Sequence, residues 1–210
     1  GGQQSAALEP DLEDRFDKAL FFAGEAHVDP RRALLALRER LQSLGGRIMF
    51  AASGEEDAAG FDWRIDCTGI GARSSLDNLR GVRGEMLLLR CRDVMFRRPV
   101  RMLHPRIPVY IVPRADGIFM VGATMVESDD TGAITVRSMT DLLNAVYTLH
   151  PAFADAEIVE AGVGLRPSFP DNIPRVMRDG RTIHVNGMYR HGFLLSPARA
   201  EDVKNIVFGI

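Results

Sequence analysis

The stretch from Gly81 to Glu127 is the part of this 210-residue sequence that most narrows the possible folds. It contains four short segments rich in apolar and β-branched residues, separated by charged or glycine-containing turns, which is the pattern of consecutive antiparallel strands. We therefore expect an antiparallel sheet here. The four segments are Met86–Cys91, Val100–Leu103, Val109–Pro113 and Ile118–Ala123, and Ala115-Asp116-Gly117 supplies a turn between the last two.

Amphipathic helical patterns flank this run. Each combines apolar residues every three or four positions with an N-terminal capping residue, and the first also ends at the glycine pair Gly45-Gly46. We expect the apolar stripe of each helix to pack against another element. The predicted helices are Pro30–Leu44 with Asp29 as N-cap, Met139–His150 with Ser138 as N-cap, and a last helix that begins at Ser196-Pro197.

Further strand-like segments complete the pattern. The order of helix, two strands, long antiparallel run, helix, two strands and helix predicts an α+β fold, or the second half of an interleaved two-domain α/β protein. The additional strands are Arg47–Ala52, Phe61–Cys67, Ala156–Gly162 and Thr182–Asn186.

Composition excludes several functional classes. The net charge of -2 gives no basic face for a nucleic-acid partner, and no apolar run approaches the length of a membrane span. The only cysteines, Cys67 and Cys91, rule out a disulfide scaffold and favour a reducing, cytoplasmic location. No histidine has a cysteine or carboxylate at metal-ligand spacing, so we expect no metal site.

Two glycine-containing segments are candidate ligand sites. The segment Gly69–Ser74 follows a strand and nearly matches a dinucleotide-binding turn, but Ser74 replaces the third glycine, so a tight turn that touches a cofactor or simply reverses the chain is the better interpretation. The loop Asn186–Leu195 leads into a helix N-terminus, which offers unpaired N–H groups to an electron-rich ligand. Arg166 lies between apolar residues and a proline, where a guanidinium either grips a carboxylate or is an ordinary surface arginine.

Five groups of segments add a family resemblance. They are Glu25–Arg31; Ile65–Gly69; Val109–Arg114 with Val121–Met125; Gly164–Pro167 with Asp171–Pro174; and Gly187–Gly192 with Leu195–Pro197. In this order they resemble the D-amino acid oxidase superfamily of FAD enzymes, most closely its glycine oxidase branch of the type linked to thiamine biosynthesis. The resemblance spans about Ala7 to the C-terminus.

The resemblance implies the oxidative deamination of a small amino acid by a flavin, with molecular oxygen as the final acceptor and hydrogen peroxide as a product. No protein acid or base is required for transfer of the Cα hydrogen, so catalysis depends mainly on orientation. Four residues are implied to contact the substrate. Arg166 and the Tyr110 hydroxyl would bind its carboxylate, the Arg190 carbonyl would face its amino group, and Met125 would pack beside it.

The implied cofactor is noncovalent FAD, because no cysteine follows Cys91 in the region where covalent family members attach it. Family members begin with a strand, a GxGxxG turn and a helix that hold the FAD pyrophosphate. This sequence has no such unit, so it resembles the C-terminal part of a larger enzyme, and we do not expect these residues alone to bind FAD tightly. The implied cofactor contacts are Thr68 and Gly69, and then Gly187, Tyr189, Arg190, His191, Gly192, Phe193 and Leu194.

The resemblance also implies a division of the chain. Residues 1–80 and 161–210 would belong to the FAD-binding domain, and residues 81–160 would form the antiparallel-sheet substrate domain. Glycine, another D-amino acid and an N-methyl amino acid remain open as substrates, and assembly into a homo-oligomer is also open. The alternative from another class of function is a non-catalytic module that binds carboxylates and has lost the flavin-binding unit.

Overall fold

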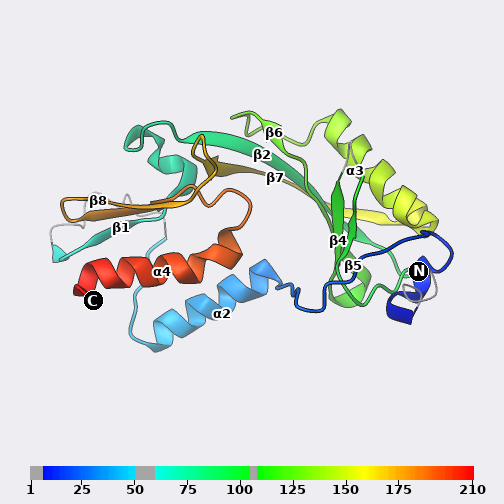
Figure 1. The fold of residues 1–210 in the computed structure, drawn as a ribbon, viewed down its shortest axis with the longest axis horizontal. Coiled ribbons are helices and arrows are strands. Elements are labelled where there is room, and N and C mark those ends of the chain that lie inside the picture. Colours follow the sequence, from blue (N-terminus) through cyan, green and yellow to red (C-terminus); the bar gives the residue numbers. More distant parts are fainter. Residues whose placement is uncertain (1–6, 51–59, 105–107) are drawn as a thin grey trace. The chain divides into compact units, whose positions relative to one another are not determined.

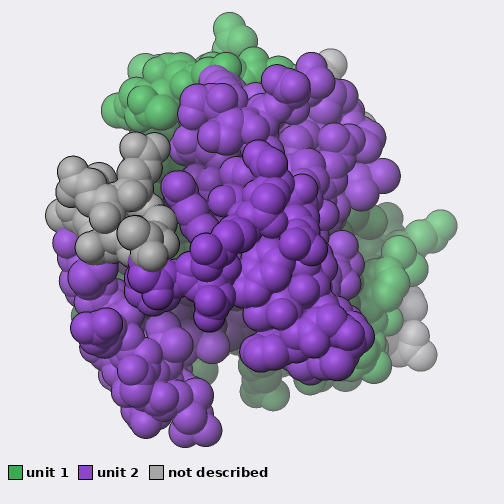
Figure 2. Space-filling view, turned by 90° about the vertical axis from the view of Figure 1, so that its left-hand side faces the viewer, with its two compact units in different colours: residues 1–27, 83–164 green, residues 28–82, 165–210 purple. Residues whose placement is uncertain are grey.

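The computed structural model describes residues 7–50, 60–104 and 108–210, and it divides into two compact units (Figure 1 and Figure 2). Unit 1 comprises Gly1–His27 and Arg83–Gly164, and unit 2 comprises Val28–Val82 and Leu165–Ile210. Each unit is therefore assembled from two separate stretches of chain. Antiparallel strands, a parallel pair and several helices confirm the predicted mixed α and β class. No helix in the described ranges is both long and apolar enough to cross a membrane.

The sheet of unit 1 confirms the predicted antiparallel run. Its strand order is β3-β4-β5-β2-β6, and β7 also pairs with β2 (Figure 1). The β4–β5 turn uses Asp116 and Gly117, both at positive φ, as the local sequence predicts. Of these strands, β2 begins six residues before the predicted Met86–Cys91, and β7 is longer than the predicted Ala156–Gly162. The strands are β2 (Arg80–Arg90), β3 (Val100–Met102), β4 (Val109–Pro113), β5 (Ile118–Gly122), β6 (Val126–Glu127) and β7 (Glu157–Ser168).

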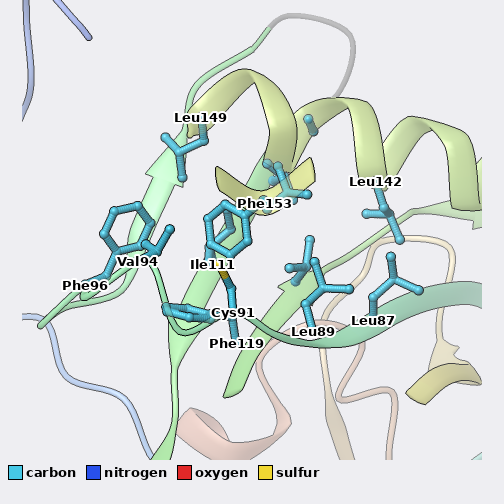
Figure 3. Close-up of a cluster of buried hydrophobic side chains, with 14 residues drawn as sticks. Leu87, Leu89, Cys91, Val94, Phe96, Ile111, Phe119, Leu142, Leu149 and Phe153 are labelled. Atoms are coloured by element: carbon cyan, nitrogen blue, oxygen red, sulfur yellow. The ribbon is translucent and has the colours of Figure 1, made fainter. Parts of the chain in front are cut away.

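One face of this sheet carries the main hydrophobic core. Alternate residues of a strand point to the same side, so Leu87 and Leu89 of β2 lie together in this core (Figure 3). The helix α3 (Val136–Leu149) packs its apolar stripe against them, and the rings of Phe119 and Phe153 meet edge to face with centroids 5.2 Å apart. The buried stripe of α3 consists of Leu142, Ala145, Val146 and Leu149.

The start of α3 corrects one sequence prediction. Ser138 is not the N-cap: Thr135 is, because its hydroxyl oxygen accepts a hydrogen bond from the Ser138 backbone N–H at 3.2 Å. Threonine and serine both suit an N-cap. Thr135 takes this position because it also makes a contact with a residue that is distant in sequence. The backbone N–H of Thr135 donates to the Glu85 carboxylate at 3.3 Å.

Unit 2 contains a small sheet with the order β1-β9-β8. The strand β9 (Thr182–Asn186) has the predicted bounds and runs parallel to β1 (Arg64–Asp66), which is shorter than the predicted Phe61–Cys67. The strand β8 (Arg175–Asp179) pairs with β9 and was not predicted. The predicted strand Arg47–Ala52 is wrong over residues 47–50, which find no strand partner in the described parts of the chain, and residues 51–52 lie outside those parts.

Two helices of unit 2 contain no fully buried residue. The helix α2 (Pro30–Ser43) begins as predicted, with the Asp29 carboxylate accepting hydrogen bonds from the N–H groups of Arg31 and Arg32. The expected packing of its stripe is wrong for the described residues, since no residue of α2 is buried and its leucines are 45–63% exposed. The helix α4 (Gly192–Phe208) also buries none of its residues.

Candidate functional site

A cavity of about 500 Å³ in unit 2 lies beside the carboxyl ends of β1 and β9. Because these two strands are parallel, the residues that follow them meet at one edge of the sheet, which is where α/β proteins bind ligands. The middle of the helix α4, from Ser196 to Val203, forms another wall. The cavity is lined by Ile65, Cys67, Gly69, Pro167, Val185, Asn186, Met188, Ser196, Arg199, Ala200 and Val203.

Hydrogen bonds fix the turn that carries Thr68 and Gly69. The Asp66 carboxylate accepts from the Thr68 N–H at 2.9 Å and from the Thr68 hydroxyl at 2.7 Å, and His184 Nδ1 lies 3.2 Å from its other oxygen. Burial raises the pKa of Asp66, but the bonds from Thr68 and the adjacent His184 outweigh it and hold this pKa below its usual value. The carboxylate is therefore charged at neutral pH and holds the turn at the cavity.

The segment after this turn is not the start of a dinucleotide-binding helix. Gly69–Ser74 forms a short 3-10 helix, η3, rather than a long α-helix. Gly69 has a positive φ of 61°, and its carbonyl accepts a hydrogen bond from the Asn186 side chain at 2.8 Å. This bond joins the turn after β1 to the end of β9, so two segments of the predicted cofactor site are adjacent.

The loop after β9 lies against the end of β7. The backbone N–H of Tyr189 donates to the Pro167 carbonyl at 3.1 Å, which places the predicted cofactor loop next to the chain position that follows Arg166. Gly187 has a φ of 77°, and a Cβ there would overlap the ring of Phe169, so only glycine fits. Arg166 is partly buried and Arg190 is exposed.

The helix α4 begins earlier than the sequence predicts. Ser196 is not its N-cap, because the helix starts at Gly192 and the Ser196 hydroxyl donates to the Gly192 carbonyl at 2.5 Å. His191 occupies the N-cap position without a side-chain hydrogen bond to the first turn. The first residues of this 17-residue helix therefore belong to the predicted loop Gly187–Leu194. The first N–H groups of a helix have no partner within the helix, which suits an electron-rich ligand.

The other two predicted substrate residues belong to unit 1. Tyr110 of β4 and Met86 of β2 both lie opposite Gly122 of β5, on the face of the sheet away from the main core. The Tyr110 hydroxyl is 3.5 Å from the position that a Cβ of Gly122 would take, so it lies close above this glycine. Met125 follows β5 by three residues and is 46% exposed.

Sequence reasoning did not identify several residues of these regions. Arg199 lines the cavity, and Arg83 and Glu85 form a buried ion pair in unit 1. The sequence did contain a signal for this ion pair: Arg83, Glu85, Leu87 and Leu89 alternate along β2 and therefore share one face of the strand. Among residues 7–50, 60–104 and 108–210, no three His, Cys, Asp or Glu side chains gather as metal ligands.

A cavity at the carboxyl ends of parallel strands is typical of nucleotide-binding α/β proteins, and here it accompanies a separate antiparallel sheet. The sequence model of the FAD dependent oxidoreductase family, abbreviated DAO, matches residues 1–205. The chain belongs to this family.

Relatives within the family narrow the comparison. A Rhizobium etli protein named thiamine biosynthesis oxidoreductase ThiO is 57% identical over 198 residues, which cover 94% of this chain and 60% of that protein. A glycine oxidase of Pseudomonas aeruginosa is 26% identical over 99% of this chain and 63% of its own length. The crystal structure of glycine oxidase from Geobacillus kaustophilus matches with a TM-score of 0.56 and 27% identity, covering 65% of this chain and 37% of that one. The chain thus spans about 60% of the length of these curated relatives.

Proposed function

We propose that the protein carrying this chain is an FAD-dependent amino acid oxidase that deaminates glycine or another small amino acid, with molecular oxygen as acceptor. The observation that carries the proposal is the family match over residues 1–205, together with relatives named glycine oxidase and thiamine biosynthesis oxidoreductase. The packing of the Tyr189 loop against Pro167 supports it, because it brings the regions of Arg166 and Arg190 together.

The cavity of unit 2 has the chemistry to hold part of a flavin nucleotide. Its lining is largely apolar, and its polar contributors include the Asn186 amide and the buried Nε–H of Arg199, which has no hydrogen-bond partner in the described structure. These donors favour an electron-rich group. Of the proposed cofactor contacts, Gly69 lines the cavity, and the Gly187–Leu194 loop contributes Met188 to it.

Noncovalent attachment is part of the proposal. Cys67 is the only thiol of the cavity lining, and burial, followed by the charge of Asp66, raises the pKa of this thiol. A raised pKa keeps the sulfur protonated and poorly nucleophilic at neutral pH. Bound FAD would supply the acceptor for the hydrogen and electron pair that leave the substrate Cα.

The residues of the chain would bind and orient the substrate. Arg166 would hold the carboxylate through two parallel hydrogen bonds, and the Tyr110 hydroxyl would donate a third. The Arg190 carbonyl would accept from the amino group, and Met125 would limit the size of the substituent on Cα. No side chain is assigned as an acid or base, so the rate would depend on how precisely Cα is oriented. We also propose that residues 81–160 serve the substrate, and that residues 1–80 and 161–210 serve the cofactor.

The experiment is a comparison of two arginine-to-lysine variants in the full protein. Bound flavin is first quantified from its absorption spectrum, and glycine-dependent hydrogen peroxide formation is then measured. Arg166→Lys should raise KM by about tenfold or more, because an ammonium cannot reproduce the planar two-pronged contact. Arg137→Lys, at an exposed position of α3, should leave KM unchanged.

Two results would contradict the proposal. An unchanged KM and kcat in Arg166→Lys would remove the carboxylate assignment. A full protein that binds carboxylates but carries no flavin and forms no peroxide would instead support the non-catalytic binding module.

A further inference from the structure

Two charged residues are completely enclosed in unit 1. Arg83 is 2% exposed and Glu85 is 0% exposed, and both lie on the face of β2 that Leu87 and Leu89 continue into the core. Burying an ion pair is costly, and replacing one by apolar residues is often neutral or stabilising. Core packing alone therefore does not explain why these two residues stand at this end of the core.

The Glu85 carboxylate gathers donors from three parts of unit 1. It accepts from Arg83 Nε at 3.1 Å and Nη2 at 2.9 Å, from the Thr124 hydroxyl at 2.8 Å and from the Thr135 N–H at 3.3 Å. Burial raises the pKa of Glu85, but hydrogen bonds from Ser138, Thr124 and Arg83 outweigh it, so its pKa is lower than usual. The carboxylate stays ionised and fully occupied by these donors.

The Arg83 guanidinium extends the network to the connection between β6 and α3. Nη1 donates to the Asp130 carbonyl at 2.7 Å and lies 3.2 Å from the Asp130 carboxylate, and Nη2 donates to the Ala133 carbonyl at 2.6 Å. Arg83 therefore attaches Asp130 and Ala133, two residues within this connection, to the strand β2.

The same network holds a bulge between β5 and β6. Met86 pairs with Gly122 and Arg83 pairs with Val126, so the three residues 123–125 face only two residues of β2. Thr124 is fixed from both sides: its N–H donates to the Glu85 carbonyl at 3.1 Å, and its hydroxyl accepts from the Glu85 N–H at 2.9 Å while donating to the Glu85 carboxylate. A bulge re-aims the side chains that it carries, and the last residue of this bulge is the half-exposed Met125.

We propose that Arg83 and Glu85 are positioning residues, which hold the 123–125 bulge and thereby set where Met125 stands as a wall of the substrate site. The role of Met125 in the substrate site rests on the proposed function. The effect of Arg83 and Glu85 on the position of Met125 does not. Neither charged residue touches the substrate. Their effect is on which substituents at Cα are accepted.

The test uses Thr124→Val in the full protein, a variant of nearly equal volume that removes the hydroxyl from the network. The kcat/KM for glycine is compared with that for D-alanine, which is one methyl larger, and the ratio should change roughly tenfold, the effect of one misplaced methylene-sized contact. In parallel, NMR of ¹³C-methyl methionine follows the Met125 signal, assigned with Met125→Leu. That signal should shift or broaden.

Three variants make the result specific. Thr124→Ser keeps the hydroxyl and should restore both readouts. Val146→Ala weakens the core at α3 without touching the network, so it should lower Tm but leave the substrate ratio and the Met125 signal unchanged. Arg83→Lys loses the two-pronged contact with Glu85 and should move the Met125 signal even if Thr124→Val does not fold.

An unchanged Met125 signal in Thr124→Val and Arg83→Lys would overturn the positioning role. A shifted signal with an unchanged substrate ratio would overturn the link to specificity. If the wild-type protein oxidises neither amino acid, the proposed function fails, and the NMR measurement still decides whether the network positions Met125.

Discussion

Replacing Gly187 by alanine should destabilise unit 2 through two separable effects. Gly187 follows β9 with a φ of 77°, in the left-handed region that side chains disfavour. A Cβ at this position would also overlap the ring of Phe169. That ring is 1% exposed and packs with Ala72, Leu76 and Leu79 in the small core of unit 2, so it cannot move aside without opening this core.

Gly180 provides a matched control in the same unit. Its φ of 56° is also left-handed, but a Cβ there would meet no atom within 4 Å. Gly180→Ala should cost about 1 kcal/mol, the left-handed penalty alone. Gly187→Ala should cost about 1–3 kcal/mol more, since a core forced to accept extra volume loses that amount. The difference between the two variants isolates the overlap with Phe169.

The assay is urea unfolding followed by tryptophan fluorescence. The sequence has a single tryptophan, Trp63, and it lies in unit 2 with the Arg178 guanidinium 4.7 Å from its ring centroid. Its emission therefore reports the unfolding of this unit. Equal losses of free energy in the two variants would refute the reasoning, because they would show that Phe169 yields to a Cβ without cost.

Two further variants test local electrostatics and capping. Asp66→Asn should destabilise the protein at neutral pH, because the lowered pKa of Asp66 stabilises the folded state while the carboxylate is charged. The loss of free energy of unfolding should become smaller as the pH falls below about 4, and urea unfolding at pH 7 and pH 3.5 measures it. As a control, Asp62→Asn at an exposed carboxylate should show no such trend. Asp29→Ala should weaken the start of α2 by about 1 kcal/mol, whereas Asp29→Asn keeps the cap; equal loss of circular dichroism at 222 nm in both variants would contradict the capping role.

Local signals in the sequence were sufficient where neighbours in the chain decide the structure. The Asp29–Pro30 start of α2 depends on a carboxylate and the two N–H groups after it, so the residues themselves predict it. The strand β9 was also predicted at its exact bounds, because its apolar alternation is undisturbed. The strand β8 was missed because its charged residues Arg175, Arg178 and Asp179 mask the pattern.

Contacts distant in sequence decided what the local signals could not. Ser138 suits an N-cap, but α3 begins at Thr135, whose backbone N–H donates to Glu85, 50 positions earlier in the sequence. Ser196 also suits an N-cap, but α4 begins earlier, at the end of the loop in which the Tyr189 N–H donates to the Pro167 carbonyl. The alternate spacing of Arg83 and Glu85 in β2 suggests an ion pair, but it does not reveal the further acceptors and donors that residues 124–135 supply. The residues implied by family resemblance stay predictions until substrate and cofactor binding are measured.

The division of each unit into two stretches has a consequence for synthesis on the ribosome. All residues of unit 1 are present once Gly164 has emerged, whereas unit 2 still lacks Leu165–Ile210. During this interval β1 lacks its partner β9, and the α2 leucines are already in water. Nascent chains are vulnerable to aggregation while apolar surface and strand edges are unpaired. Slower translation of the codons for residues 165–210 should therefore lower the yield of folded protein, and a trigger-factor-type chaperone should restore it.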